Sequence, residues 1–293
     1  MRVHVVDGTF ELFRAHYAPR PSHASASGKD LKATVGVVGS LLGLLSDPQE
    51  QVTHLAVAFD NPIRSFRNAL FAGYKTDDGI DPALYAQLDD IEQAVAALGV
   101  TVWSMKEFEC DDALATAAVQ FAKDPRVTQV RVMTPDKDLG QVLEGERIVQ
   151  VDRMRKRVFT EATLRAERGF GPKSIPDFLA LVGDTADGIP GLEGFGEKGA
   201  AAVLSAYPHL EDIPDDGKTW SAKVRGAEKL AATLASHRQD ATLYRTLATL
   251  RLDVPLTESL EQLEWKGASR AAWSAWCTAA GIEKFADRPR RFS

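Results

Sequence analysis

Four short apolar segments, each followed by acidic residues and then by a helical pattern, place the strongest constraint on how this chain folds. Residues 1–6, 54–59, 100–104 and 127–134 have the length and apolar character of buried strands. Asp7 and Asp60 directly follow the first two segments, and Glu109 and Asp136 lie just beyond the other two. Strands joined by helical crossovers form parallel sheets, in which the carboxyl ends of the strands share one edge. We therefore expect these carboxylates to converge.

The order of the predicted elements indicates an α/β protein with a central, mostly parallel sheet flanked by helices. Helical patterns occupy 31–45 and about 82–98, while 148–152 and 158–159 are typical of a short hairpin. From residue 161 onward helical periodicity dominates. We predict an α/β domain over 1–160 and a helical domain over 161–293.

Composition excludes several classes of protein. With 44% hydrophobic and 26% charged residues in 293, the chain can bury a substantial core, so disorder is excluded as its main character. The start lacks the apolar core of a signal peptide, and no apolar run is long enough to span a membrane. Cys110 and Cys277 are too few for a disulfide framework or a cysteine-based zinc site. We expect a cytoplasmic protein without membrane association.

Nine acidic residues at strand ends or in glycine-flanked loops are candidate metal ligands. One such residue alone is more often a helix cap or a turn residue. Together, close carboxylates raise one another's pKa unless cations neutralise them, so a converged set predicts bound divalent metal. Oxygen-only ligands favour Mg²⁺ or Mn²⁺, and two such ions can support phosphodiester hydrolysis. The nine residues are Asp7, Asp60, Glu109, Asp111, Asp112, Asp136, Asp138, Asp184 and Asp187.

The formal net charge of −6 at first argues against a nucleic-acid partner. Removing the nine negative charges of the candidate site from that total leaves +3 for the rest of the chain. The remaining surface can therefore be basic enough to bind DNA.

The stretch GDTADGIPGLEGFGEKGA, residues 183–200, is the most specific in the chain. Its glycines Gly191, Gly194 and Gly196 permit a tight turn with positive φ, and a helix of small residues is predicted to begin at Glu197. Such a turn can present backbone amides to a phosphate, with Lys198 beside them. A glycine-rich turn can also be a plain loop, but this pattern has too many fixed positions for a chance match.

The chain resembles the 5′-nuclease family, which comprises flap endonucleases, phage 5′-exonucleases and the N-terminal 5′–3′ exonuclease domain of bacterial DNA polymerase I. The resemblance implies a PIN-like α/β domain with an arch over about 64–92, and a helix–three-turn–helix that grips duplex DNA at about 180–205. The matching stretches follow the family's order: VDGTFELFRAHY at 6–17, AFDNPIRSFRNALFAGYK at 58–75, ECDDALAT at 109–116, TPDKDLGQVL at 134–143, DFLALVGDTADGIPGLEGFGEKGA at 177–200 and KVRGAEKLAATL at 223–234.

For the metals, the resemblance implies two sites. One is built around Asp7, Asp60, Glu109, Asp111 and Asp112, and the other is completed by Asp136, Asp138, Asp184 and Asp187. Two or more Mg²⁺ or Mn²⁺ ions are implied, held by a mixture of direct and water-mediated ligands.

For DNA, Lys75 matches the family's lysine at the base of the arch, where its ammonium would polarise the scissile phosphate. Tyr74 matches a residue that stacks on a base near the cut, and we expect Arg67, in the same basic and aromatic cluster, to bind DNA. On sequence alone, Tyr74 and Lys75 fit an exposed helix end equally well.

In the second half, the resemblance implies a K⁺ held by backbone carbonyls of the glycine-rich turn. We also expect Lys223, Arg225 and Lys229 to lie on one helical stretch and to touch phosphates of the same duplex. Each of these three residues is about as readily explained by a solvated helix face.

The chain departs from the family where relatives carry further basic residues after the Tyr-Lys pair. Here 76–79 reads TDDG, which weakens the expected grip on a single-stranded flap. All nine acids are present, which argues against relatives that have lost their metal ligands. The chain ends at Ser293, so we expect no attached polymerase.

The function that this resemblance implies is a metal-dependent, structure-specific 5′ nuclease of replication and repair, acting as 5′–3′ exonuclease and flap endonuclease. Its expected substrates are 5′ flaps, nicked or gapped duplexes and single-stranded 5′ ends. We expect a monomer, associated with the nucleoid in a bacterium, that works with a DNA polymerase and a ligase in trans. Two alternatives remain: a non-catalytic scaffold for branched DNA, and an RNA-directed nuclease of the same superfamily.

Overall fold

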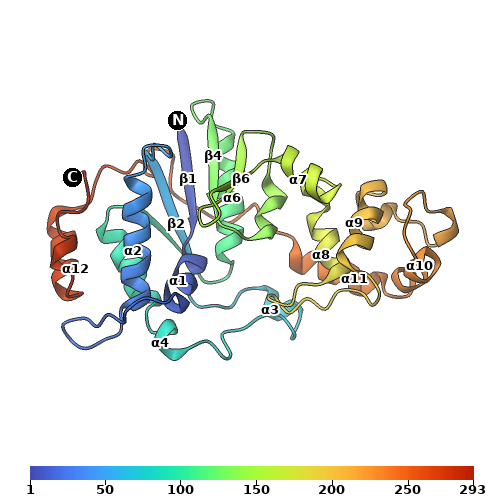
Figure 1. Ribbon diagram of the computed structural model, residues 1–293, viewed down its shortest axis with the longest axis horizontal. Helices are drawn as coiled ribbons and strands as arrows, with labels where there is room; N and C mark the ends of the chain where they lie inside the picture. The colour runs from blue at the N-terminus through green and yellow to red at the C-terminus, as the bar shows by residue number, and fades with distance from the viewer. The chain divides into compact units, whose positions relative to one another are not determined.

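The computed structural model describes residues 1–293 and divides the chain into two compact units (Figure 1). The first unit comprises Met1–Arg64, Asp77–Thr134 and Leu252–Ser293, and the second comprises Ser65–Thr76 and Pro135–Arg251. Each unit is therefore assembled from segments that are distant in the sequence.

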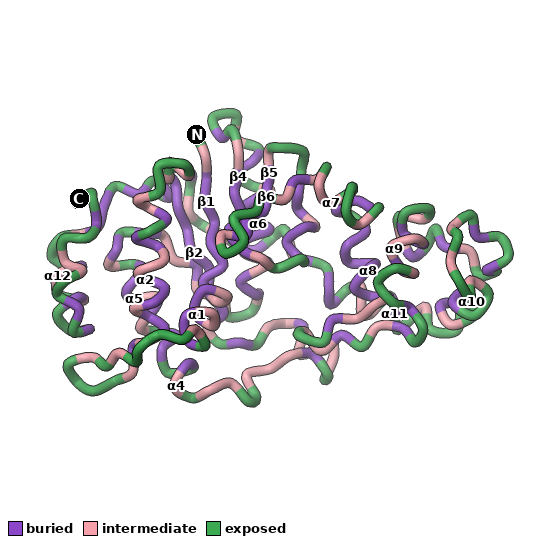
Figure 2. Tube along the Cα trace, in the orientation of Figure 1, coloured by how far each residue is buried: buried purple, intermediate pink, exposed green.

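The first unit is built on four parallel strands in the order β3-β2-β1-β4. These strands are β1 (Arg2–Asp7), β2 (His54–Asp60), β3 (Thr101–Met105) and β4 (Gln129–Met133). In their register Asp7 lies opposite Ala58, and Asp60 lies opposite Met105. The tube trace shows the two central strands buried, as expected for apolar strands covered on both faces (Figure 2). The four predicted strands and their parallel arrangement are confirmed.

Six α-helices belong to the first unit: α1 (Gly8–Tyr17), α2 (Lys32–Leu45), α4 (Pro82–Tyr85), α5 (Leu88–Ala97), α6 (Cys110–Ala122) and α12 (Arg270–Ala279). The helix predicted over about 82–98 is broken at Ala86 and Gln87. Gln87 is fully buried, and its Oε1 accepts hydrogen bonds from the backbone N–H groups of Ala33 and Thr34 at 3.1 Å. The break thus satisfies donors at the start of α2 that have no partner within that helix.

The second unit contains the hairpin of β5 (Ile148–Asp152) and β6 (Arg157–Phe159), which pair antiparallel as predicted. Its α-helices are α3 (Arg67–Leu70), α7 (Glu161–Arg168), α8 (Ile175–Val182), α9 (Glu197–Ala206), α10 (Ala227–Ser236) and α11 (Arg238–Ala248). Short 3₁₀ turns are η1 (Lys137–Val142), η2 (Pro172–Ser174), η3 (Leu210–Asp212) and η4 (Gly217–Thr219). Its core includes Phe178, Leu179, Leu204 and Leu234.

The compact units do not follow the predicted boundary at residue 160. The hairpin and η1 belong to the second unit, whereas 252–293 return to the first. There, Trp265 donates its backbone N–H to Thr53 O at 2.8 Å, and Leu55 donates to Leu263 O at 2.9 Å. These backbone contacts join residues some 200 positions apart, so local sequence patterns do not reveal them. No helix of the structure is long and apolar enough to cross a membrane.

Candidate active site

Five of the nine candidate acids lie in the first unit, at the carboxyl ends of its strands and at the start of α6. Asp7 ends β1 and Asp60 ends β2, while Glu109, Asp111 and Asp112 surround the first turn of α6. All except Asp111 are buried. The sequence prediction had assigned this same set to one metal site.

The Asp7 carboxylate is held by two donors, and the Cys110 thiol, whose Sγ lies 3.2 Å from the carbonyl oxygen of Ala58, is close to it. Asp7 Oδ1 accepts the backbone N–H of Phe10 at 2.7 Å and lies 3.6 Å from the Cys110 Sγ. Its Oδ2 accepts the hydroxyl of Thr134 at 2.8 Å. Burial, followed by the charges of Asp7 and Asp60, raises the pKa of the Cys110 thiol well above its ordinary value, so this group is a neutral donor. Asp7 therefore caps α1 and also keeps a fixed orientation at the edge of the sheet.

Asp60 is fixed by contacts of the same kind. Its Oδ1 accepts the backbone N–H of Cys110 at 2.6 Å, and its own N–H donates to the Thr9 hydroxyl at 2.8 Å. Asp112 accepts the backbone N–H of Glu109 at 3.0 Å and thereby supports the start of α6. The capping roles and the candidate metal roles of these acids are thus compatible.

The other four acids lie in the second unit. Asp136 accepts the backbone N–H of Asp138 at 2.9 Å, and Asp184 accepts that of Ala186 at 2.9 Å. The Asp138 side chain is buried, and its Oδ1 has no hydrogen-bond partner. Burial raises the pKa of Asp138 well above its usual value, and the negative charges of Asp136, Asp187 and Asp184 raise it further.

The donor chemistry of this second group fits a hard divalent cation. A buried carboxylate oxygen without a partner is costly, and a cation would both pair it and relieve the repulsion between neighbouring carboxylates. Every side-chain donor in the group is an oxygen, as Mg²⁺ and Mn²⁺ prefer. No three His, Cys, Asp or Glu side chains are arranged so that they could hold a metal ion as they stand. The assignment of individual ligands therefore stays a prediction.

Lys75 is ion-paired with Asp187. Its Nζ lies 2.9 Å from Asp187 Oδ1, and its backbone N–H donates to the carbonyl of the same residue at 3.0 Å. Lys137 forms a second ion pair in this unit, with its Nζ 2.8 Å from Asp184 Oδ2. Both lysines therefore offset part of the negative charge of the second acidic group.

The environment of Tyr74 differs from both environments predicted from the sequence. Its side chain is 3% exposed, packs in the core of the second unit and directs its hydroxyl toward Asp187 Oδ2 at 3.4 Å. The ring is neither an exposed helix end nor an open platform for a base, so this arrangement gives no support to the predicted stacking role. Tyr74 instead helps to anchor the segment that carries Lys75.

Arg67 is a structural residue in this fold, which contradicts its prediction as a DNA contact. The side chain is 1% exposed. Its Nε donates to the carbonyl of Leu247 at 2.7 Å and its Nη2 to that of Thr249 at 3.0 Å. The guanidinium thus satisfies carbonyls at the C-terminal end of α11, which lack partners within that helix.

The glycine-rich turn joins α8 to α9 as predicted, and α9 begins at Glu197. Gly191 has φ +73°, and a Cβ there would lie 2.5 Å from the backbone nitrogen of Gly183. Gly194 has φ +89°, whereas Gly196 has φ −94° and open space around it. Only the first two positions require glycine for their backbone conformation.

The basic residues of this region are exposed. Lys198 lies in the first turn of α9, and neither its side chain nor those of Lys223, Arg225 and Lys229 form an ion pair or hydrogen bond. Lys223 and Arg225 precede α10, which begins at Ala227, so the prediction that they share one helix with Lys229 is wrong. Gly226, with φ +75°, ends the preceding turn and separates them from the helix.

The acidic segment after Lys75 is held in place by contacts of its aspartates within the first unit. Asp77 Oδ1 lies 2.7 Å from the Nε of Arg64. Asp81 caps α4 and lies 3.0 Å from His16 Nε2. Part of the negative charge that distinguishes this segment is therefore neutralised locally.

Two family models match the chain in succession. The N-terminal resolvase-like domain of 5′–3′ exonucleases matches residues 2–169, and the C-terminal SAM fold of 5′–3′ exonucleases matches residues 170–271. The chain belongs to the 5′–3′ exonuclease family. Family membership confirms the predicted fold class: a PIN-like α/β domain with a mostly parallel sheet, followed by a helical SAM-like fold.

Members of this family with similar sequences include DNA polymerase I of Mycobacterium leprae, at 34% identity over 266 residues. That match covers 88% of this chain but 28% of the polymerase, so the chain spans little more than a quarter of such relatives. A 5′–3′ exonuclease of Aquifex aeolicus is 29% identical over 265 residues, covering 90% of this chain and 86% of that protein.

Among solved structures, the fold is similar to a bacteriophage T5 flap endonuclease in a pseudo-enzyme-product complex with DNA and metal ions. The TM-score is 0.62 at 16% identity, with 85% of this chain and 89% of that chain covered. At this identity the likeness concerns the fold.

Sequence reasoning missed the residues that orient the acids. Thr134 and Cys110 belong to the motifs TPDKD and ECDD, yet only the fold brings the Thr134 hydroxyl to Asp7 and the Cys110 amide to Asp60. A hydroxyl at the end of a strand beside an acidic motif is the signal that could have identified Thr134.

Proposed function

We propose that this protein is a metal-dependent, structure-specific 5′ nuclease that hydrolyses DNA phosphodiesters, acting as 5′–3′ exonuclease and flap endonuclease. The observation that carries the proposal is the two sets of acidic side chains. Six of their nine members are buried, and the buried Asp138 Oδ1 has no hydrogen-bond partner. Membership of the 5′–3′ exonuclease family supports it. A phosphodiester-cleaving site is one of the few settings in which so many buried acids are useful, because bound divalent ions offset their charge.

Asp7, Asp60, Glu109, Asp111 and Asp112 would hold divalent metal in one group, and Asp136, Asp138, Asp184 and Asp187 in the other. When bound, Mg²⁺ or Mn²⁺ supplies the Lewis acidity for attack by water on a phosphodiester. Thr134 and the amide of Phe10 keep the Asp7 carboxylate oriented for this task, and the amide of Cys110 does the same for Asp60. Lys75, once released from Asp187, would place its positive charge beside the scissile phosphate and stabilise the negative charge there.

The duplex would be gripped by the turn between α8 and α9. Its backbone amides, with the exposed cations Lys198, Lys223, Arg225 and Lys229, offer contacts to phosphates without reading base sequence. A K⁺ on backbone carbonyls of this turn is part of the proposal. The positive φ of Gly191 and Gly194 supports it, because this conformation allows close approach of the backbone.

The same test distinguishes this function from two others. A scaffold for branched DNA gains nothing from buried carboxylates, which repel phosphates in the absence of metal. An RNA-directed nuclease would share the acids but prefer RNA strands. We propose that the protein acts in replication and repair as a monomer in the cytoplasm, together with a polymerase and a ligase in trans.

The test is cleavage of labelled substrates by the purified protein in Mg²⁺ or Mn²⁺. Flap, nicked, single-stranded and RNA–DNA substrates are compared at equal concentration. Release of 5′ products from DNA flaps and nicks supports the proposal. Binding of all substrates without any cleavage indicates a scaffold, and preferential cleavage of RNA strands indicates the RNA-directed nuclease.

A further inference from the structure

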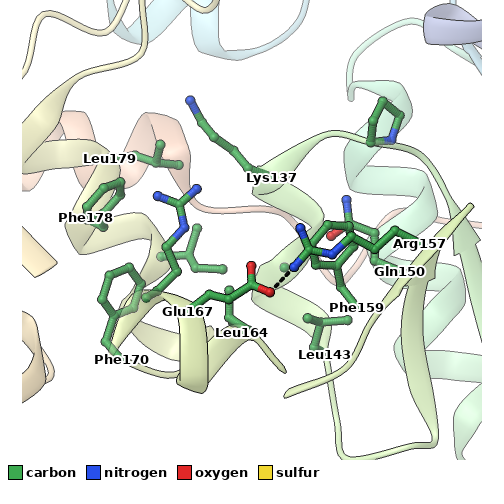
Figure 3. Close-up of a pocket in the computed structure, with 14 residues that line it drawn as sticks. Lys137, Leu143, Gln150, Arg157, Phe159, Leu164, Glu167, Phe170, Phe178 and Leu179 are labelled. Atoms are coloured by element: carbon green, nitrogen blue, oxygen red, sulfur yellow. Dashed lines mark hydrogen bonds and ion pairs between the residues drawn. The ribbon is translucent and has the colours of Figure 1, made fainter. Parts of the chain in front are cut away.

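The second unit contains a pocket that the proposed nuclease mechanism does not use. Its volume is about 240 Å³, and it lies between η1, the β5–β6 hairpin, α7 and the start of α8 (Figure 3). Its apolar walls are formed by Leu143, Phe159, Leu164, Phe170, Phe178 and Leu179. A volume somewhat below the roughly 300–1,000 Å³ of pockets for drug-sized ligands suits one small ring system with a short polar extension.

Three cations and a single carboxylate line this pocket. Arg157 of β6 forms an ion pair with Glu167 of α7, as the dashed line in Figure 3 shows. Lys137 is paired with Asp184. Arg168 forms neither an ion pair nor a hydrogen bond, although its side chain is partly buried. Its guanidinium carbon lies 5.5 Å from the centre of the Phe178 ring.

A partly buried guanidinium without an anionic partner is a ready binding group for phosphate or carboxylate. Guanidinium binds such groups through paired N–H donors, and these bonds strengthen where water is partly excluded. The ring centroids of Phe170 and Phe178 lie 5.2 Å apart, and these largely buried rings line the apolar part of the pocket together with the half-buried ring of Phe159. The pocket therefore combines one anion-binding group with an apolar, aromatic wall.

We propose that this pocket binds a single deoxynucleotide, with the base against the aromatic wall and the phosphate at Arg168 and Arg157. This ligand has one flat ring system and one anionic group, and thus matches both halves of the pocket. It can arrive as a free mononucleotide or as the terminal nucleotide of a 5′-phosphorylated strand. Glu167 competes with the phosphate for Arg157, so its removal frees a second guanidinium for the ligand.

The test is calorimetric binding in EDTA, where no metal is present and no cleavage is needed. The probes are dTMP, thymidine, inorganic phosphate, and a four-residue oligothymidylate with and without a 5′-phosphate. We expect dTMP to bind at least about tenfold more tightly than thymidine or phosphate alone, because both halves of the pocket contribute. A preference of the same size for the phosphorylated oligonucleotide, with no binding of dTMP, identifies a strand end as the source of the ligand.

Variants of pocket residues test whether the ligand binds in this pocket. Arg168→Gln should weaken binding about tenfold or more, whereas Glu167→Gln should strengthen it a few-fold. Arg165→Gln is the matched control, since Arg165 lies on the same helix, pairs with Glu161 at 2.9 Å and does not line the pocket. Leu164→Phe, which fills the apolar part, should abolish the preference for dTMP over phosphate.

Equal affinity for dTMP and phosphate, or binding that Arg168→Gln leaves unchanged, would overturn the proposal. Thermal melts of each variant establish that it is folded. Binding is measured without metal and does not depend on cleavage. A negative binding result therefore does not count against the proposed nuclease activity, and a negative nuclease assay does not count against this pocket.

Discussion

Lys75 and Asp187 are joined twice, by an ion pair of 2.9 Å between their side chains and by a backbone hydrogen bond of 3.0 Å. The segment that carries Lys75 is thereby attached to the loop that carries two of the acids, Asp184 and Asp187. Gly188 makes this approach possible, because a Cβ at that position would lie 2.2 Å from the carbonyl oxygen of Gly73. The cation proposed to act on the scissile phosphate is held beside the acidic group within a single compact unit.

This relationship predicts a specific defect for Lys75→Ala. A charge that acts more strongly in the transition state than in the ground state affects rate more than affinity, so the single-turnover rate should fall by about 10²-fold or more. The dissociation constant for flap DNA should change little. Lys75→Arg is the matched control and should retain part of the rate. A rate for Lys75→Ala within a few-fold of wild type would show that Lys75 stabilises only the fold.

Asp138 predicts an unusual pH dependence of stability in the metal-free protein. Its folded-state pKa is raised, so the folded protein holds this proton more tightly than the unfolded chain does. The stabilisation is fully present below the unfolded pKa of about 4 and is lost as the pH rises through the folded pKa. Asp138→Asn should not show this loss of stability at higher pH, because the side-chain amide of Asn does not ionise. In EDTA, the Tm of Asp138→Asn relative to wild type should therefore increase from pH 4 toward neutral pH.

The same pair of proteins tests for metal. Added Mn²⁺ should raise the Tm of wild type, because a ligand that binds only the folded state stabilises it. Asp138→Asn should lose the part of that gain that comes from metal bound by its own group of acids. A Tm difference that is constant with pH, together with an equal response to Mn²⁺, would contradict the role given to Asp138.

Thr134 is predicted to position the Asp7 carboxylate. Thr134→Val keeps the shape but removes the donor to Asp7 Oδ2, which should cost about 1–3 kcal/mol of unfolding free energy because the oxygen is buried. The apparent affinity for Mn²⁺ should fall about 10-fold or more, as for other residues that orient metal ligands. Thr134→Ser retains the hydroxyl and is the control. Loss of stability with unchanged Mn²⁺ affinity in Thr134→Val would limit Thr134 to a structural role.

Variants of the glycine-rich turn allow duplex binding to be tested separately from phosphodiester cleavage. Gly194→Val places a β-branched residue at φ +89° and should weaken duplex binding, whereas Gly196→Ser, at φ −94° in open space, should be tolerated. Lys198→Ala should reduce the slope of log affinity against log salt by about one, as expected for one lost phosphate contact. The measurement is duplex flap binding at several salt concentrations. Unchanged slopes and affinities would mean that DNA binds elsewhere.

Much of the fold could be predicted from the sequence, because its strands and most helices are local, strongly patterned segments. The four strands of the first unit and the hairpin lie within one or two residues of their expected positions. The break at Gln87 was not predictable, because it depends on a contact with α2 that is more than 50 residues away in the sequence.

The candidate site shows the same division between local and distant information. The acids could be identified from their motifs, but their partners could not. Arg67 has the sequence environment of a DNA-binding arginine, yet it is buried against carbonyls 180 and 182 residues further along the chain. Tyr74 likewise becomes part of a core formed by helices far from it in sequence.

The central claim is that the two carboxylate groups serve metal-dependent cleavage of DNA, and one measurement tests it most directly. Single-turnover cleavage of a 5′-labelled flap substrate is followed for wild type and Asp184→Ala in Mg²⁺, in Mn²⁺ and in excess EDTA, with flap affinity measured in parallel. Wild type should cleave in either metal and not in EDTA, while Asp184→Ala should bind the flap with similar affinity and fail to cleave it. Cleavage by wild type that persists undiminished in EDTA, or full activity of Asp184→Ala, would contradict the account.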